Sequence, residues 1–143
     1  MNDYSKLKKF NHINTEINAA YHDVALRLGL TDSAMLVIYT VCNNGGECTL
    51  EDIRKLSGMS KQTINSAIRK LEADGTVTLV PLGARKKKVC LTDNGTAFAE
   101  KTVMKIIKIE NDIYETWEKE EWSIYIGLTE RFLRDFKLHT ESL

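Results

Sequence analysis

Residues 60–75 constrain the fold of this chain more than any other stretch. An α-helix would gather four apolar residues on one side, because they recur at intervals of three or four: Ile64, Ala67, Ile68 and Leu71. Ser60 is a favourable N-cap before this run, and Gly75 closes it with the residue that a helix C-terminus prefers. The sequence therefore predicts an amphipathic helix that packs one side against a core.

The other side of this helix is polar and has no carboxylate in its first two turns. In the major groove of DNA, glutamine and asparagine can pair with adenine, and lysine and arginine with guanine. A solvated surface helix has the same amphipathic pattern, so the neighbouring segments decide between the two interpretations. The candidate DNA-reading residues are Ser60, Lys61, Gln62, Thr63, Asn65, Ser66, Arg69 and Lys70.

A shorter helix is predicted at residues 50–57, just before the first one. Ile53 and Leu56 are its expected inward residues, Leu50 is a third candidate, and Gly58 suits the helix C-terminus. Two helices joined by a turn of about three residues that contains glycine form a helix-turn-helix. This arrangement favours the DNA-reading interpretation.

Two β-prone segments follow, at residues 77–80 and 88–91, and the loop between them is basic. They predict a β-hairpin, or wing. Cations on a small loop are usually just solvated, but next to a DNA-reading helix they would lie along a phosphate backbone. The candidate wing contacts are Arg85, Lys86, Lys87 and Lys88.

Three features occur here in a fixed order: the segment Leu71-Glu72-Ala73-Asp74-Gly75, the predicted wing, and the segment Leu91-Thr92-Asp93-Asn94-Gly95. Together they resemble the MarR family of bacterial winged-helix regulators, over nearly the whole chain. That family's wing carries an Asp-x-Arg motif in which the acid helps to fix the arginine. Arg85 matches the arginine, but Gly83 stands at the acid's position. The resemblance therefore implies a less rigidly held Arg85, with the neighbouring lysines sharing its task.

The chain's composition fits a single globular domain. It has 143 residues, of which 43% are hydrophobic and 28% charged, and its single proline favours a mainly helical fold. A net charge of zero at first argues against nucleic acid, but residues 60–91 hold seven Lys or Arg and two acids. Residues 92–143 hold seven Lys or Arg and eleven acids. The cations thus concentrate on the predicted reading segment.

A long amphipathic helix is predicted at the N-terminal end, from Asp3 to Leu28. Two more are predicted at the C-terminal end: one from Thr92 to Trp117, with Gly95 tolerated in its first turn, and a last one after a break at 118–121. Their apolar stripes exceed what one domain can cover, which implies a partner, although a monomeric bundle is the alternative. The family resemblance implies a two-fold homodimer on palindromic DNA. The candidate interface residues are Phe10, Ile13, Ile17, Trp122, Leu128, Phe132 and Phe136.

A further helix is predicted from a cap at Thr31 or Asp32 to about Asn43. The resemblance implies a small-molecule pocket between this helix, the first helix and the start of the helix after Thr92. A small aromatic or anionic effector is the implied ligand. The pocket candidates, for each of which core packing is the alternative, are Tyr21, His22, Tyr39 and Phe98.

No pattern of catalytic or metal-binding residues is found. The cysteines lack metal-like spacing and are expected to pack as small apolar residues: Cys42, Cys48 and Cys90. The sequence holds no nucleophile elbow or phosphate loop, so we expect a non-enzyme without cofactor or metal. Without a long apolar run or a signal-peptide-like start, a cytoplasmic location is expected.

We therefore predict a mainly α fold with a small β-hairpin wing, an α+β winged helix-turn-helix flanked by dimerisation helices. Residues 1–30 form the N-terminal dimerisation helix, 31–91 the DNA-binding region, and 92–143 the linking and C-terminal dimerisation helices. The predicted function is a homodimeric regulator that represses from a palindromic double-stranded operator and is released by a small ligand. A winged-helix protein-interaction module without specific DNA binding is the alternative.

Overall fold

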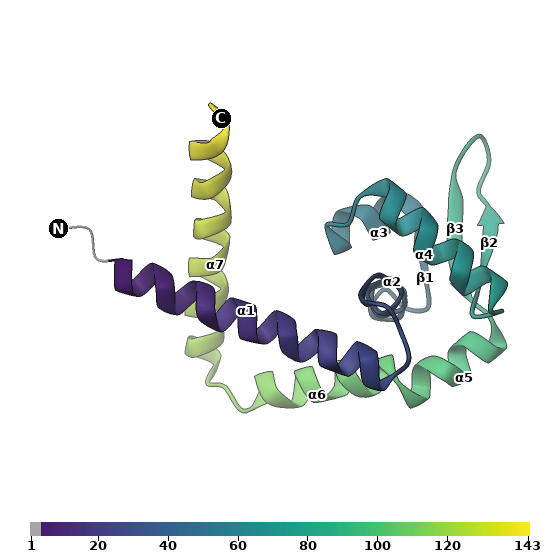
Figure 1. Ribbon diagram of the computed structural model, residues 1–143, viewed down its shortest axis with the longest axis horizontal. Coiled ribbons are helices and arrows are strands. Elements are labelled where there is room, and N and C mark those ends of the chain that lie inside the picture. The colour runs from purple at the N-terminus through teal and green to yellow at the C-terminus, as the bar shows by residue number, and fades with distance from the viewer. Residues whose placement is uncertain (1–3) are drawn as a thin grey trace. The chain divides into compact units, whose positions relative to one another are not determined.

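The computed structural model describes residues 4–143, which form seven helices and three strands (Figure 1). Asp3, where the first helix was predicted to begin, lies outside the described residues. The chain divides into two compact units, one reaching up to Lys105 and the other comprising Ile106–Leu143. The described helices and strands agree with the predicted mainly helical fold with a small antiparallel wing sheet.

Helix α2 (Asp32–Asn43) is the centre of the first unit. Its buried residues are Ala34, Met35, Val37, Ile38, Thr40 and Val41. It contacts α1 (Tyr4–Arg27), α3 (Leu50–Ser57) and α4 (Lys61–Ala73), and Figure 1 shows it end-on with α3 and α4 on one side. The predicted start is confirmed, because the Thr31 Oγ1 accepts a hydrogen bond from the Ala34 N–H at 3.1 Å.

The predicted helix-turn-helix is present in α3 and α4. Each helix begins with a hydroxyl cap: Thr49 Oγ1 accepts from the Asp52 N–H, and Ser60 Oγ accepts from the Thr63 N–H. Between them, Gly58 ends α3 in the left-handed conformation, with φ at 71°. The four apolar residues that predicted α4 are all buried: Ile64, Ala67, Ile68 and Leu71. This packing turns the polar side of α4 outward.

The prediction of an inward Leu56 is wrong. Ile53 is fully buried, whereas Leu56 is 64% exposed. At about 100° per residue, Ser57 and Leu50 lie on the same side of α3 as Ile53, and Leu56 is turned about 90° from the middle of that side. A repeat of three residues was therefore not enough to place Leu56 in the core.

The wing is an antiparallel sheet of three strands in the order β1-β3-β2. The two predicted strands are confirmed, each slightly longer than expected: β2 (Val77–Pro81) and β3 (Lys87–Leu91). The edge strand β1 (Glu47–Thr49) was not predicted, because three residues are too few to show an alternating pattern. Val89 at the centre of β3 pairs with both Cys48 and Leu79, and it is fully buried.

Thr92 joins the wing to α5 (Asp93–Lys101). Its Oγ1 caps α5 by accepting from the Gly95 N–H at 2.9 Å, and the same hydroxyl donates to the carbonyls of Gly75 and Thr76. A Cβ atom on Gly95 would collide with the Thr76 carbonyl oxygen. Gly95 is therefore needed at this joint, where the sequence suggested only that a helix could tolerate it.

The prediction of one long helix from Thr92 to Trp117 is wrong. The helix is interrupted at Thr102, whose φ and ψ are −129° and −90°, between α5 and α6 (Val103–Glu115). The Thr102 N–H donates to the Ala99 carbonyl at 3.1 Å, three residues back instead of the four of an α-helix, while the Thr102 Oγ1 donates to the Phe98 carbonyl at 2.7 Å. The apolar periodicity continues across this break, so the pattern alone could not show it.

The second unit comprises the rest of α6 and α7 (Lys119–Thr140). Glu118 begins α7 with a capping box: its side chain accepts from the Glu121 N–H, and its own N–H donates to Glu121 Oε1 at 2.8 Å. A break before the last helix is thus confirmed, but it lies at residues 116–118, and the predicted break at 118–121 was placed too late because α7 already begins at Lys119. The turn between α6 and α7 holds a cluster of aromatic rings with centroids 4.7 to 6.4 Å apart: Tyr114, Trp117, Trp122 and Tyr125.

Candidate nucleic-acid interface

The polar side of α4 carries the predicted reading residues. Seven of the eight are exposed: Ser60, Lys61, Gln62, Thr63, Ser66, Arg69 and Lys70. The remaining one, Asn65, is half-buried. The Ser60 hydroxyl donates to Thr63 Oγ1 at 2.9 Å while it caps the helix, so these two groups already have partners within the protein. Gln62 and Asn65 are the amide side chains on this face, and amides are suited to pair with adenine.

The tip of the wing is a tight turn closed by a hydrogen bond of 2.8 Å from the Leu82 N–H to the Lys86 carbonyl. Gly83 has a φ of 105°, and Arg85, with a φ of 65°, is the one non-glycine residue with a left-handed backbone between residues 4 and 143. The glycine at the position of the family's acid thus serves the backbone of this turn. Among the described residues, no carboxylate forms an ion pair with Arg85.

Lys88 differs from the other three wing cations. Arg85, Lys86 and Lys87 are exposed, but the Lys88 side chain is only 26% exposed and its Nζ lies 2.9 Å from Glu47 Oε2. The hydrogen bond to Glu47 raises the pKa of Lys88 above its ordinary value, so the ammonium stays charged. The structure therefore brings Arg85, Lys86 and Lys87 together at the tip and binds Lys88 to β1.

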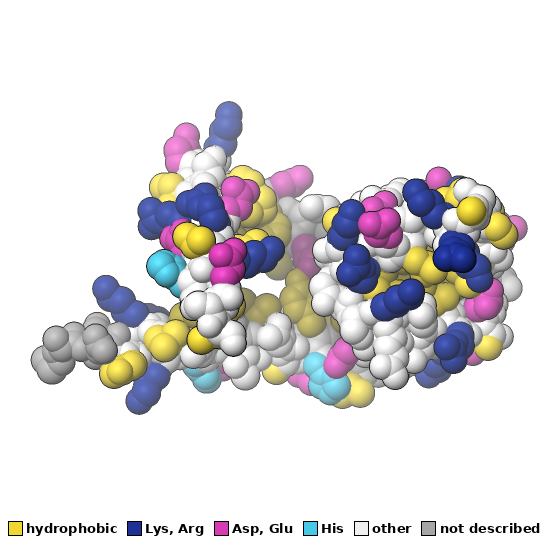
Figure 2. All heavy atoms as spheres, turned by 90° about the horizontal axis from the view of Figure 1, so that it is seen from above, with side chains coloured by type: hydrophobic (Ala, Val, Ile, Leu, Met, Phe, Trp, Pro, Cys, Tyr) yellow, Lys and Arg dark blue, Asp and Glu magenta, His cyan; other side chains and the backbone are white. Residues whose placement is uncertain are grey.

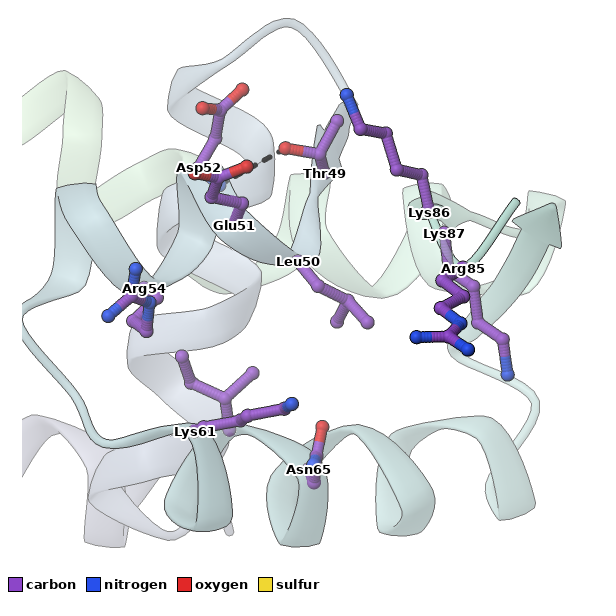
Figure 3. A pocket seen from close by; sticks show the side chains of 11 residues that line it. Thr49, Leu50, Glu51, Asp52, Arg54, Lys61, Asn65, Arg85, Lys86 and Lys87 are labelled. Atoms are coloured by element: carbon purple, nitrogen blue, oxygen red, sulfur yellow. Dashed lines mark hydrogen bonds between the residues drawn. The ribbon is translucent and has the colours of Figure 1, made fainter. Parts of the chain in front are cut away.

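A groove of about 560 Å³ lies between the start of α3, the start of α4 and the wing tip (Figure 3). Two apolar side chains, Leu50 and Ile64, form part of its lining. Five cations and two carboxylates surround them, together with Thr49 and Asn65: Arg54, Lys61, Arg85, Lys86, Lys87, Glu51 and Asp52. The groove thus joins the two predicted groups of DNA contacts, the reading helix and the wing, into one cationic surface.

Positive charge is concentrated around this groove. Figure 2 shows Lys and Arg side chains around a patch of hydrophobic atoms on the face of the first unit where α3, α4 and the wing lie. None of the five groove cations forms an ion pair with a carboxylate among residues 4–143. Unpaired cations around a groove attract a polyanion, and a phosphate backbone would supply the missing counter-charges.

Sequence reasoning missed the contribution of α3 to this groove. Leu50, Arg54, Glu51 and Asp52 line it, although the sequence pattern indicates only a supporting helix at residues 50–57. The helix-turn-helix spacing was the available signal, because it places the start of the first helix close to the reading helix. The wing's approach to that end depends on strand pairing, which the sequence does not show.

The predicted pocket residues are distributed over three helices. Tyr21 and His22 lie on α1, Tyr39 on α2 and Phe98 on α5, and none of them lines the groove. The His22 Nδ1 lies 2.8 Å from Asp32 Oδ1, a contact that joins the end of α1 to the start of α2. Tyr39 and Phe98 are half-buried, whereas Tyr21 is 40% exposed.

The predicted interface residues remain open in the single chain. Phe10, Ile13 and Ile17 on α1 are 45 to 48% exposed, and α1 buries Ala25 alone among its described residues. On α7, which buries none, the corresponding residues are 40 to 57% exposed: Trp122, Leu128, Phe132 and Phe136. Each helix thus presents apolar area that a second chain could cover.

The cysteines are free thiols. Burial raises the pKa of the Cys42 and Cys48 thiols, and the charge of Asp52 adds to the effect on Cys48. A thiol that stays protonated is a poor nucleophile, which fits packing better than redox chemistry. Among residues 4–143, no group of three or more His, Cys, Asp or Glu side chains is placed to hold a metal ion.

No single helix in the described part of the chain is long and apolar enough to cross a membrane. The bent pair α1 and α2 reaches the required length and composition only when both helices are taken together, across an angle of 92°.

Comparison with known sequences finds a family match over part of the chain. The model of the MarR family matches residues 28–87, which include α2, the helix-turn-helix, β2 and the first residue of β3. No curated protein sequence matches the chain.

Solved structures have the same fold. A MarR family regulator from Neisseria meningitidis superposes over 99% of both chains with a TM-score of 0.81, at 18% identity. BpsR of Bordetella bronchiseptica, whose DNA binding is regulated by 6-hydroxynicotinic acid, is 20% identical with a TM-score of 0.62, over 87% of this chain and 98% of that one. NadR in complex with 4-hydroxyphenylacetate is 16% identical with a TM-score of 0.69, over 87% and 89%. Residues 28–87 of this chain thus match the MarR family, and the fold of the whole chain is similar to that of MarR family transcription regulators.

Proposed function

We propose that the chain forms a homodimer that binds a palindromic DNA operator and represses transcription from it. The observation that carries the proposal is the surface shared by α4 and the wing tip. It combines amide side chains that can read base edges, Gln62 and Asn65, with exposed cations that no carboxylate among residues 4–143 neutralises. A winged helix that served only to bind proteins would instead be expected to expose apolar area on α4.

In this proposal, α4 enters the major groove and the wing lies beside it. Base contacts come from the first turns of α4, and phosphate contacts from Lys86 and Lys87. The guanidinium of Arg85 reaches the minor groove, where a narrow A·T tract offers the strongest negative potential. Lys88 contributes by holding the wing through Glu47, which supports the wing without occupying a phosphate.

The exposed stripes on α1 and α7 support the dimer. Their aromatic and aliphatic residues would be costly to leave in water, and a two-fold partner would cover the same residues on both chains. Two reading surfaces related by that axis would match two half-sites of a palindrome. This symmetry explains how a surface as small as one α4 and one wing could select a site.

The test is selection of random DNA duplexes by the purified full-length protein. The proposal expects one enriched palindrome whose half-sites are about one helical turn or a multiple of it apart. Enrichment of a single half-site would overturn the proposal that the protein binds DNA as a dimer. Absence of any enriched sequence would overturn specific DNA binding. Repression is tested separately with a reporter gene behind the selected site, where activation would contradict it.

We further propose release from DNA by a small aromatic acid. Support comes from two proteins of the same fold, since 6-hydroxynicotinic acid regulates DNA binding of BpsR and NadR binds 4-hydroxyphenylacetate. The candidate pocket residues remain Tyr21, His22, Tyr39 and Phe98. Calorimetric titration with a panel of aromatic acids should give binding heat, and a bound ligand should weaken operator affinity by the same factor as the operator weakens the ligand. A panel without heat and without effect on the operator complex would contradict this part.

A further inference from the structure

Leu50 stands at an unusual place for an apolar side chain. It is the first residue of α3, it is only half-buried, and it lines the groove between α4 and the wing tip (Figure 3). Lys61 and Asn65 line that groove from α4, and Arg85 lines it from the wing. Because Leu50 is only half-buried, the rest of its apolar surface faces the groove and is available to a ligand.

The start of α3 is unsuited to hold a phosphate. Helix N-termini often bind anions, but here Thr49 already occupies the capping position, and Glu51 and Asp52 lie in the first turn. Glu51 forms an ion pair with Lys55 at 3.3 Å, whereas Asp52 forms none among residues 4–143 and keeps a negative charge at this end of the helix. A phosphate is therefore expected nearer to Lys61 and the wing cations, on the side of Leu50 away from these acids.

We propose that Leu50 packs against a deoxyribose of the DNA strand that passes between the reading helix and the wing. With α4 in the major groove and the wing at the minor groove, one sugar–phosphate backbone has to cross the surface between them. The cations around the groove match its phosphates, and the apolar lining matches the hydrophobic face of its sugar. This inference rests on the proposed function and adds a contact that carries no charge.

A sugar contact has a signature that separates it from the two other kinds of DNA contact. Removing it weakens binding to every sequence, because all nucleotides share the sugar. It leaves the salt dependence unchanged, because no counterion release is lost. Loss of a base contact would instead affect the operator alone, and loss of a phosphate contact would flatten the salt dependence.

The experiment measures binding of Leu50→Ala to the selected operator and to a random duplex over a salt series. We expect both affinities to fall by about three- to tenfold, as for the loss of a modest apolar contact, with an unchanged slope of affinity against salt. Leu56→Ala is the matched control, because Leu56 lies on the same helix, is 64% exposed and does not line the groove. Lys87→Ala provides the comparison for a phosphate contact.

Several outcomes would overturn the inference. These are unchanged binding by Leu50→Ala, an equal loss in Leu56→Ala, a loss confined to the operator, or a flattened salt slope. Circular dichroism and thermal unfolding show whether Leu50→Ala keeps the fold, and Leu50→Met, which retains apolar bulk, should restore most of the affinity in either case. Failure of the wild-type protein to bind any duplex would overturn the proposed function, whereas normal wild-type binding with an unaffected variant would overturn this inference alone.

Discussion

The Nζ atom of Lys88 lies 2.9 Å from Glu47 Oε2, and the two residues belong to neighbouring strands of the wing sheet, β3 and β1. In this register Lys88 is paired with Thr49, the residue that caps α3. The ion pair therefore fastens the wing next to the start of the helix-turn-helix. It also separates Lys88 from the exposed cations that follow Gly83.

We predict that Lys88→Met and Lys87→Met have opposite profiles. Lys88→Met should lower the melting temperature and leave the salt slope of DNA binding nearly unchanged, because its charge is already paired with Glu47. Lys87→Met should leave the melting temperature unchanged and lower the salt slope of DNA binding by about one. Thermal unfolding and a salt titration of each variant test this. A slope lowered equally in both would show that Lys88 contacts phosphate.

The same ion pair predicts a pH dependence. The pKa of Lys88 in the folded chain is raised above its ordinary value of 10.5. The folded chain therefore binds this proton more tightly than the unfolded chain does. The stabilisation is fully present below that pH and is lost as the pH rises through the raised pKa. The difference in melting temperature between wild type and Lys88→Met should therefore be constant near neutrality and shrink at strongly alkaline pH.

Gly95→Ala should destabilise the chain. The added Cβ would meet the Thr76 carbonyl, which also accepts hydrogen bonds from the Thr92 N–H and hydroxyl. Forcing this joint apart is expected to cost about 1 to 3 kcal/mol or more. Chemical denaturation measures the change. Gly127→Ala is the control: it lies within α7 with open space around it and should gain about 0.5 to 1 kcal/mol from helix propensity.

Much of the fold follows from local chemistry. Hydroxyl residues before apolar periodic runs marked the starts of α2, α4 and α5, and each cap is present, at Thr31, Ser60 and Thr92. Such signals work because cap and helix are neighbours in the sequence. The features that were missed leave no local pattern in the sequence: β1 exists through its pairing with β3, and the apolar periodicity continues across the break at Thr102.

The candidate site was predictable in its parts but not in its assembly. The polar side of α4 follows from the burial of its apolar side, and the basic wing tip is visible in the sequence. That Lys88 would be paired with Glu47, and that Leu50 would share a groove with Arg85, depends on how β3 packs between β1 and β2. By residue type alone, the four wing cations have the same predicted role. The strand register distinguishes Lys88, which pairs with Glu47, from the three exposed cations at the wing tip.

Charges placed in the proposed dimer surface should separate the chains. Ile17→Glu combined with Phe132→Glu puts carboxylates among apolar residues that a partner would cover, where desolvation of a charge is unfavourable. Analytical ultracentrifugation should show half the wild-type mass, and operator affinity should fall with it. Leu26→Glu is the matched control, since Leu26 is 63% exposed and lies about 180° around α1 from Ile17. An unchanged mass for the folded double variant would refute this surface.

The last prediction concerns how reading and positioning are divided between α4 and the wing. Gln62 and Asn65 lie in the first turns of α4, where the major groove comes closest, so each should contact a base edge. Gln62→Ala or Asn65→Ala should then cost about 1 to 3 kcal/mol on the operator and little on random DNA, so that specificity falls.

Lys87→Ala should behave differently, because a phosphate contact is made with any sequence. It should weaken operator and random duplex by similar factors and flatten the salt dependence by about one unit of slope. Arg85→Ala is expected to lie between the two classes, with its loss greatest on operators that carry A·T tracts under the wing. The measurement is the ratio of operator to random affinity across a salt series. If Asn65→Ala and Lys87→Ala gave the same ratio at every salt concentration, α4 would not be the reader and the wing would not be the positioner.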